Sequence, residues 1–213
     1  MSQYANLRQE YKKEQLTEDS VHTDPLLQFE TWFKEAQEAN VPEPNAFVLA
    51  TASPLNVPSA RVVLLKGVDK TGFVFYTNYN SDKSKDIAFN SHVGMCFLWH
   101  ELERQVRVMG RATKVSREES ESYFHSRPRE SQLGAWASPQ SDIISSREVL
   151  EYNLEKVTTQ FENGAVIPLP DHWGGYRIIP EEIEFWQGRP NRLHDRILYK
   201  NIDGRWKIER LAP

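Results

Sequence analysis

The sequence predicts an α+β protein, mainly β, in which an antiparallel barrel or sandwich carries surrounding helices. Short β-branched and aromatic runs, such as residues 46–51 and 73–78, are separated by Pro, Asn, Asp and Gly. These runs come in hairpins and not in regular alternation with helices, which argues against a doubly wound fold. The chain has 213 residues, of which 39% are hydrophobic and 26% charged. It is therefore long enough to bury a core as one compact domain.

Local residue patterns predict where the helices and strands lie along the chain. Residues 1–20 are polar and aperiodic, so we expect a mobile N-terminal segment, followed by a single domain over residues 21–213. Asp24 and Pro25 begin a helix that runs to about Asn40, because Pro is favoured at the first helical position. Strands are expected over residues 46–51, 61–66, 73–78, 93–99, 104–115, 175–179, 183–187, 196–200 and 205–211.

Turn and cap signals complete the prediction. Residues 69–72 lie at hairpin distance between residues 61–66 and 73–78, so these two strands are expected to pair antiparallel. Residues 201–204 form another hairpin turn. Further helices are expected over residues 81–90, from Ser116 and from about Ser145. The last of these has an apolar stripe that includes Val157, and we expect this stripe to pack on the sheet.

The charge distribution narrows the classes of partner. Lys and Arg number 26 against 30 Asp and Glu, and this net charge of −4 argues against a nucleic-acid-binding protein. Residues 186–213 are nevertheless basic, with seven basic and three acidic side chains, whereas residues 1–45 have four and nine. A solvated basic surface and a site for a small anionic ligand both remain open for the basic end.

Composition and absent motifs exclude other classes. Mean hydropathy is −0.63 and no apolar run approaches 18 residues, so we expect no membrane association; the polar start also lacks a signal peptide, which favours the cytoplasm. Cys96 is the one cysteine, which excludes an intrachain disulfide and a Cys-based zinc cluster, and its apolar neighbours predict a buried thiol. The H-E-x-x-H and G-x-S-x-G motifs are missing, and no metal is expected.

Cations near strand ends are the first candidate site. The chain lacks a glycine-rich phosphate loop, so side chains would have to hold a phosphate. Arg61 and Lys66 stand at the two ends of one predicted strand, and alternation puts them on opposite faces. Tyr76 and Thr77 end the next strand, and Lys83 lies in the helix that follows. Hydroxyl and ammonium donors together suit a phosphate ester.

A second candidate lies in residues 123–131, which we expect to form a helix end and a loop. Tyr123, Arg127 and Ser131 supply phenol, guanidinium and hydroxyl groups there. These groups are plausible ligands for a second phosphate.

A third candidate lies near the C-terminus. Arg192, His194 and Arg196 alternate and would share one face of an extended chain, as expected for a ligand site. A structural salt-bridge ladder that uses Asp195 is the alternative. On another predicted strand, Gln105 belongs either to a site or to a polar outer face.

Taken together, the motifs resemble one enzyme family. They are RVVLLK, FYTN, ERQVRVMG, YFHSRPRESQLGAWAS, QSDIIS, WGGYRI, EFWQGRPNRLHDR and the terminal WKIERLAP. Between about Leu7 and Pro213 the chain resembles the pyridoxine (pyridoxamine) 5′-phosphate oxidase family. The resemblance implies an FMN-binding split β-barrel that forms a homodimer with two flavin sites across the interface. It also implies oxidation of pyridoxine or pyridoxamine 5′-phosphate to pyridoxal 5′-phosphate, with hydride transfer from C4′ to flavin N5 and then to O2, which yields H2O2.

The resemblance also assigns roles to residues. The residues it implies for FMN are Arg61, Val62, Val63, Leu64, Leu65, Lys66, Tyr76, Thr77, Lys83, Gln105, Gln140, Ser141, Trp186 and Arg196. The residues it implies for the substrate phosphate are Lys66, Tyr123, Arg127 and Ser131. Arg192 and His194 would lie against the pyridine ring as the catalytic candidates, and Arg8, Gln9, Glu10 and Tyr11 would close over the substrate.

One position departs from the family pattern. Many relatives have Ser-Arg-Lys where this chain has Ser81, Asp82 and Lys83. Because a carboxylate repels a phosphate, we expect Asp82 to turn outward, with Arg61, Lys83 and Lys85 supplying the positive charge.

Alternative functions belong to other classes. A flavin reductase or another oxidoreductase on the same barrel would keep the FMN contacts without needing YFHSRP and RLHDR, both of which are intact here. A non-enzymatic carrier of pyridoxal phosphate would bind the aldehyde without turnover. A nucleic-acid-binding protein is disfavoured by the charge and by the lack of a recognition motif.

Overall fold

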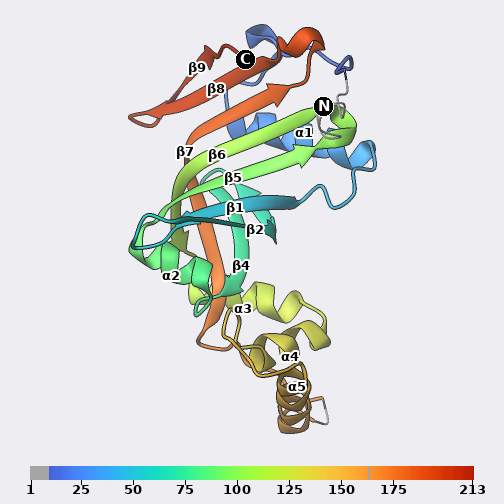
Figure 1. Cartoon of the computed structure of the whole chain (residues 1–213), viewed down its shortest axis with the longest axis vertical. Helices are drawn as coiled ribbons and strands as arrows, with labels where there is room; N and C mark the ends of the chain where they lie inside the picture. The colour runs from blue at the N-terminus through green and yellow to red at the C-terminus, as the bar shows by residue number, and fades with distance from the viewer. Residues whose placement is uncertain (1–9, 163) are drawn as a thin grey trace, which may run out of the picture.

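A computed structural model describes residues 10–162 and 164–213, and its centre is one curled antiparallel sheet (Figure 1). The strands are β1 (Ala46–Ala52), β2 (Pro58–Leu64), β3 (Gly67–Asp69), β4 (Gly72–Asn78), β5 (His92–Trp99), β6 (Arg104–Lys114), β7 (Trp173–Gln187), β8 (Asp195–Ile202) and β9 (Arg205–Arg210). They are ordered β2-β1-β5-β6-β7-β4-β3, and β8 joins β7 to β9. Every strand pair is antiparallel, which confirms the predicted fold class.

Within the described residues, five α-helices accompany the sheet. They are α1 (Pro25–Glu38), α2 (Asp82–Phe89), α3 (Arg117–Ser126), α4 (Arg129–Ala137) and α5 (Glu148–Gln160). Figure 1 shows α1 beside the upper strands and α3, α4 and α5 together at the lower end of the molecule. Within the part of the chain that the structure describes, no helix is long and apolar enough to cross a membrane.

Strand β7 organises the sheet because it changes partners along its length. Residues 173–178 pair with β4 and residues 182–187 pair with β8, whereas β6 pairs with the other side between Tyr176 and Gln187. The β6–β7 register shifts between Met109 and Gly110, where Gly110 faces Pro180. The sequence predicted two separate strands here, which is wrong, because a bulge accommodates Pro180 within one continuous strand.

The segment around Lys66 also differs from the prediction. The expected strand 61–66 is β2, which ends at Leu64 and pairs with β1 instead of β4. The turn at residues 69–72 does form a hairpin, but its first strand is the three-residue β3. Arg61 and Lys66 line the same cavity and not opposite faces, because the strand has ended before Lys66.

The main core lies between α1 and the inner face of the sheet. Asp24 caps α1 by accepting a hydrogen bond from Leu26 N at 2.8 Å. Phe29 packs edge-on against Phe73, with 4.9 Å between ring centroids, and Trp32 packs against Phe185 at 5.2 Å. Burial of side chains of this size stabilises the fold by about 1.5–3 kcal/mol each.

A second apolar cluster holds the lower helices together. It consists of Phe124, Leu133, Ala137, Val157, Phe161, Ile167, Leu169 and Trp173. Helix α4 was not predicted, since the sequence around it was assigned to a loop. Helix α5 begins at Glu148 and packs on α4, so the prediction that its stripe packs on the sheet is wrong. Amphipathic spacing identifies an apolar face but does not identify its partner.

We expect Gly110→Ala to lower the free energy of unfolding by about 1–3 kcal/mol, the usual cost of overpacking. A Cβ at this position would lie 2.2 Å from the Ile179 carbonyl oxygen, in backbone that cannot move without breaking the bulge. The midpoint of urea unfolding measures the effect. Gly134→Ala is the control, because its Cβ meets no atom within 4 Å and Ala favours helix α4. A Gly110→Ala protein as stable as the wild type would contradict the role of the bulge.

Candidate functional site

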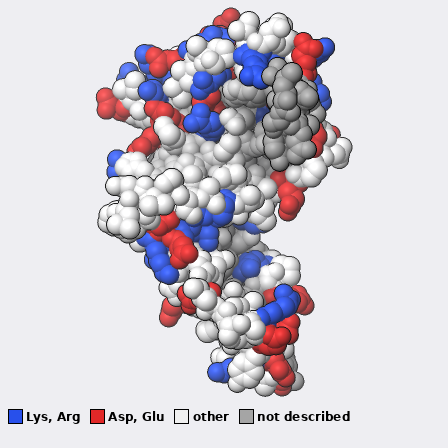
Figure 2. Space-filling model, in the orientation of Figure 1, with Lys and Arg blue, Asp and Glu red and all other residues white. Residues whose placement is uncertain are grey.

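A cavity of about 1000 Å³ lies between the sheet and helices α2, α3 and α4. Figure 2 shows Lys and Arg side chains on this face where the sheet meets the lower helices. The predicted residues that line the cavity are Arg61, Val62, Val63, Leu64, Lys66, Tyr76, Thr77, Lys83, Tyr123, Arg127, Ser131, Gln140 and Ser141. The fold therefore unites the first two candidate sites, which are separate in the sequence.

Lys83 is a buried cation with neutral partners. Its Nζ donates to Ser81 Oγ at 3.0 Å, to Gln140 Oε1 at 3.1 Å and to Thr77 Oγ1 at 3.2 Å. The side chain forms no ion pair within the described residues. Burial, followed by the charge of Arg61, lowers the pKa of Lys83. An anion bound in the cavity would stabilise the charged form of Lys83 and raise its pKa again.

Arg61 is held rigidly beside Lys83. Its Nη1 donates to Thr51 Oγ1 at 2.8 Å and to the Leu49 carbonyl at 3.1 Å, and its Nη2 donates to Ser59 Oγ at 2.7 Å. All three acceptors are neutral, and burial lowers the pKa of Arg61. Ser141 Oγ, which accepts from Asp82 N at 3.2 Å, adds a hydroxyl group to the same wall. This group of donors suits a phosphate.

Arg127 forms the second cationic point of the cavity. Its guanidinium lies 4.6 Å from the Trp173 ring centroid, and burial lowers its pKa. Its Nη1 is buried and has no hydrogen-bond partner. Tyr76 stacks on Tyr123 with 3.9 Å between ring centroids, and also on Trp173 at 5.5 Å. Buried donors are almost always satisfied, so Nη1 indicates a missing anionic ligand.

Sequence reasoning did not assign Trp173 to the site. This residue begins β7 and supports both Arg127 and Tyr76, so it shapes the cavity wall. In the sequence, Trp173 was marked only by its place in the WGGYRI motif, and nothing there distinguished it from an aromatic residue of the core.

Asp82 turns outward as expected. Its side chain is 70% exposed, and its Oδ1 lies 3.5 Å from Lys85 Nζ at the cavity rim. The expectation that Lys85 also supplies charge to the cavity is wrong, because Lys85 is exposed and pairs with Asp82.

The third candidate forms a separate cluster outside the cavity lining. Trp186 and His194 lie 4.6 Å apart by ring centroids, and Tyr11 lies 5.7 Å from each ring. Gln105 pairs with Trp186 across β6 and β7. Arg8 and Gln9 lie outside the described residues, whereas Glu10 and Tyr11 lie within them.

The arginines of this cluster do not alternate along an extended chain. Asn191 and Arg192 have φ values of 56° and 62°, in the left-handed region, so Arg192, His194 and Arg196 do not share one strand face. Arg196 binds Glu184 through Nε at 2.8 Å and Nη2 at 3.0 Å. The alternative interpretation, a structural salt-bridge ladder through Asp195, is partly confirmed, because Asp195 pairs with Arg189 and Arg210.

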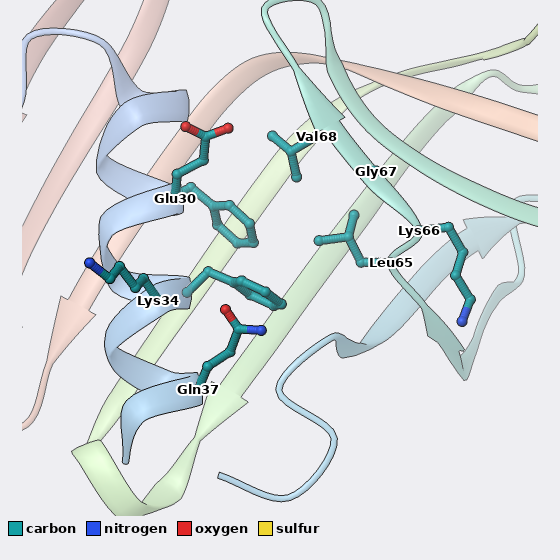
Figure 3. A pocket seen from close by; sticks show the side chains of 9 residues that line it. Glu30, Lys34, Gln37, Leu65, Lys66, Gly67 and Val68 are labelled. Atoms are coloured by element: carbon teal, nitrogen blue, oxygen red, sulfur yellow. The ribbon is translucent and has the colours of Figure 1, made fainter. Parts of the chain in front are cut away.

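A smaller cleft of about 300 Å³ lies between α1 and β3 (Figure 3). Its base is apolar and includes Phe29, Phe33 and Val68. Leu65 points into it and is 7% exposed, whereas Lys66 points away. Leu65 is therefore a core side chain whose role in binding a cofactor stays a prediction.

The fold and the cavity define a class of protein: an antiparallel split barrel with a cavity whose cationic and hydroxyl side chains suit a phosphorylated small molecule. Comparisons with known proteins agree. Residues 33–161 match the family described as pyridoxamine 5′-phosphate oxidase, and residues 173–213 match the pyridoxine 5′-phosphate oxidase C-terminal dimerisation region. This chain belongs to the pyridoxamine 5′-phosphate oxidase family.

Individual relatives match over nearly their full length. The chain is 54% identical over 215 residues to the pyridoxine/pyridoxamine 5′-phosphate oxidase of Salinibacter ruber, with 100% of both chains covered. It is 56% identical to the Crocosphaera subtropica protein of the same name, with 97% of this chain and 98% of the relative covered. The crystal structure of PhzG from Burkholderia lata, in complex with tetrahydrophenazine-1-carboxylic acid, superposes with a TM-score of 0.88 at 28% identity. That match covers 94% of this chain and 99% of PhzG.

We expect the lowered pKa of Lys83 to make the ligand-free protein less stable at neutral pH. The folded state resists protonation of Lys83, so the penalty is present below the folded pKa and disappears as the pH rises through it toward 10.5. Lys83→Met should therefore gain stability relative to the wild type at about pH 7, and this gain should shrink toward about pH 10. Urea unfolding of both ligand-free proteins measures it. Lys85→Met, at an exposed position, is the control, and an equal pH trend in both variants would contradict the assignment.

Proposed function

We propose that this chain is an FMN-dependent oxidase that converts pyridoxine 5′-phosphate or pyridoxamine 5′-phosphate to pyridoxal 5′-phosphate, with reduction of O2 to H2O2. The observation that carries the proposal is a pair of cationic side chains, the buried Lys83 and the half-buried Arg127, that line one cavity without a carboxylate partner. Lys83 and Arg127 form no ion pair among the residues that the structure describes, and Arg127 Nη1 has no partner at all. Two phosphates, one from the cofactor and one from the substrate, would satisfy both points.

The donor groups of the cavity fit FMN at one point and the substrate at the other. Lys83 and Arg61 would bind the FMN phosphate, with Ser141 beside them. Arg127 and Tyr123 would bind the substrate phosphate together with Lys66 and Ser131. Bound FMN would supply the hydride acceptor for the oxidation. The protein's own part is to hold the substrate in the orientation that this transfer requires.

A second subunit would complete each site. Trp186, Arg192, His194 and Arg196 do not line the cavity of their own chain, and all four lie in the segment that matches a dimerisation region. Figure 1 shows β8 at the upper end of the sheet, far from α3 at the lower end. A homodimer that brings the C-terminal cluster of one subunit to the cavity of the other accounts for both locations.

His194 would act there as a neutral hydrogen-bond donor. The Arg189 backbone N–H donates to His194 Nδ1 at 3.1 Å, so the ring proton lies on Nε2. Burial, followed by the Arg192 guanidinium, lowers the pKa of His194, which keeps the ring uncharged at neutral pH. In the dimer, its Nε2–H would be free to donate to a substituent of the pyridine ring. The cytoplasmic location stays a prediction.

The visible spectrum of the purified protein tests the proposal. Bound flavin should bleach when pyridoxine 5′-phosphate is added without oxygen, and it should recover with formation of H2O2 when air returns. Flavin that binds but does not bleach would support another oxidoreductase on the same barrel. Failure to bind added FMN would favour a carrier of pyridoxal phosphate.

We expect Asp82→Arg to tighten FMN binding by roughly tenfold, the equivalent of about 1.4 kcal/mol for one new charge-assisted contact. The substitution replaces a carboxylate at the cavity rim with a guanidinium near Arg61 and Lys83. Fluorescence titration of the apoprotein with FMN measures the affinity. Asp82→Asn removes the negative charge without adding a positive one and should have a smaller effect. An unchanged or weaker affinity in Asp82→Arg would refute the expectation.

A further inference from the structure

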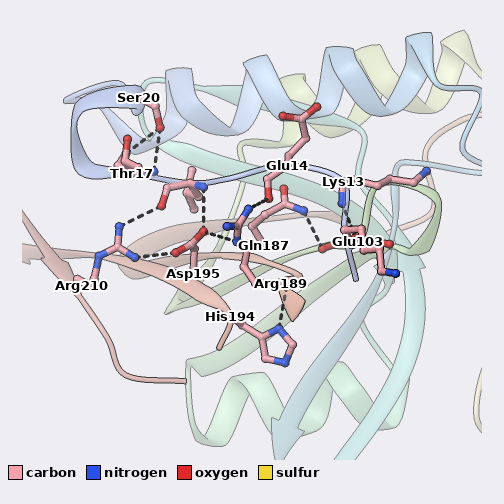
Figure 4. A network of polar contacts seen from close by, with 12 residues as sticks. Lys13, Glu14, Thr17, Ser20, Glu103, Gln187, Arg189, His194, Asp195 and Arg210 are labelled. Atoms are coloured by element: carbon pink, nitrogen blue, oxygen red, sulfur yellow. Dashed lines mark hydrogen bonds and ion pairs between the residues drawn. The ribbon is translucent and has the colours of Figure 1, made fainter. Parts of the chain in front are cut away.

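Residues 11–18, here called the strap, are hydrogen-bonded to Glu103, Arg189 and Asp195 (Figure 4). Tyr11, at the start of the strap, contacts the C-terminal cluster. Tyr11 meets Trp186 at an interplanar angle of 90° and His194 at 68°. The remaining question is what holds Tyr11 there, since residues 1–20 were expected to be mobile. The contacts of the strap answer it.

Glu103 anchors the strap next to Tyr11. One carboxylate oxygen, Oε2, accepts from Lys12 N at 2.9 Å and from Lys13 N at 3.1 Å. Glu103 lies in the β5–β6 connection with φ of 55°, a conformation that Gly and Asn adopt more readily than Glu. The turn therefore does not explain why a glutamate stands here. The two hydrogen bonds that its carboxylate accepts from the strap do.

Gly188 provides the space for the Tyr11 ring. A Cβ built on Gly188 would lie 2.7 Å from Tyr11 Cγ and 2.9 Å from Tyr11 Cβ. The Gly188 N–H also donates to the Glu103 carbonyl at 2.7 Å, which joins the two residues directly. Gly188 thus contacts Tyr11, and Glu103 binds the two residues that follow it.

The other end of the strap is tied to the residue after His194. Asp195 Oδ2 accepts from Leu16 N at 3.1 Å, and Arg210 Nη2 donates to the Leu16 carbonyl at 3.0 Å. Leu16 is 3% exposed and belongs to the main core. Arg189, whose backbone fixes the His194 ring, donates from Nη1 to the Glu14 carbonyl at 3.0 Å. The strap and the loop around His194 are therefore one connected unit.

We propose that Glu103 and Gly188 are positioning residues that hold Tyr11, which the family resemblance assigns to the substrate, beside Trp186 and His194. The inference rests on the proposed function for the identity of that substrate. It assigns no chemistry to Glu103 or Gly188, which act only through Tyr11. Loss of either residue affects the capture of the substrate more than the flavin.

A double-mutant cycle tests the role of Gly188. Gly188→Ala should raise the KM for pyridoxine 5′-phosphate by roughly tenfold, with a smaller change in kcat and no change in FMN affinity. In a Tyr11→Gly background the same substitution should have a much smaller effect, because both Tyr11 atoms that the new Cβ would meet are gone and only Glu103 Cβ, at 3.0 Å, remains close. Additive effects of the two substitutions, or a parallel loss of FMN, would overturn the proposal.

Hydrogen exchange tests the role of Glu103 without cofactor or substrate. Glu103→Gln weakens the acceptor of two strap amides, so exchange of a peptide that spans residues 11–16 should accelerate, and the KM should rise. Glu101→Gln, in the same turn, is the control, because only its backbone carbonyl binds the strap. Unchanged exchange in Glu103→Gln would overturn the anchor. If the wild-type protein oxidises no substrate, the proposed function fails, while the exchange experiment still decides whether Glu103 holds the strap.

Discussion

The long pairing of β6 with β7 is the constraint on which the rest of the structure depends. Because β7 keeps β6 on one side, its other side is free to pair with β4 at one end and β8 at the other. The bulge that faces Gly110 to Pro180 falls between these two stretches. This change of partner along β7 separates the cavity, which lies beside β4, from the Trp186–His194 cluster on the β8 side. In the homodimer proposed above, a second subunit would bring these two regions together.

The cations of the cavity destabilise the ligand-free protein, because they are removed from water without a counter-charge. Lys83 donates to three neutral oxygen atoms and Arg127 lies against the Trp173 ring, and burial lowers the pKa of both. A buried cation without a counter-charge destabilises a fold, whereas a bound anion reverses the effect. Two phosphorylated ligands would therefore stabilise the protein as well as occupy its site. Activity and ligand-dependent stability have the same origin here.

Local sequence signals were sufficient for much of the fold and for the cavity. Period-two runs and turn residues predicted most strands, and donor-rich stretches near Arg61, Lys83 and Arg127 identified residues that the fold brings together. The partner of each strand was not predictable, because the turn at residues 69–72 fits any preceding strand and the chain supplies a short one, β3. Positioning residues such as Gly188 were also missed, since a glycine whose role is to admit Tyr11 has no signature in a single sequence.

The ion pairs of the basic C-terminal segment show why counting charges in a sequence does not identify a ligand-binding site. Arg210 pairs with Glu18 and Asp195, Arg196 pairs with Glu184, and Lys200 pairs with Glu182. Much of the basic excess is therefore offset within the chain, in part by the acidic N-terminal segment. The partly exposed pairs of Arg210 and Lys200 contribute little to stability. The pair of Arg196 with the buried Glu184 also leaves little charge for a ligand. The cations that distinguish the cavity are those that line it without a carboxylate partner. Among the described residues, Lys83 is buried, Arg127 has a buried Nη1 without a partner, and Arg61 donates to neutral acceptors. The absence of a counter-charge, which only the folded structure reveals, is thus the feature that separates a phosphate site from a basic surface.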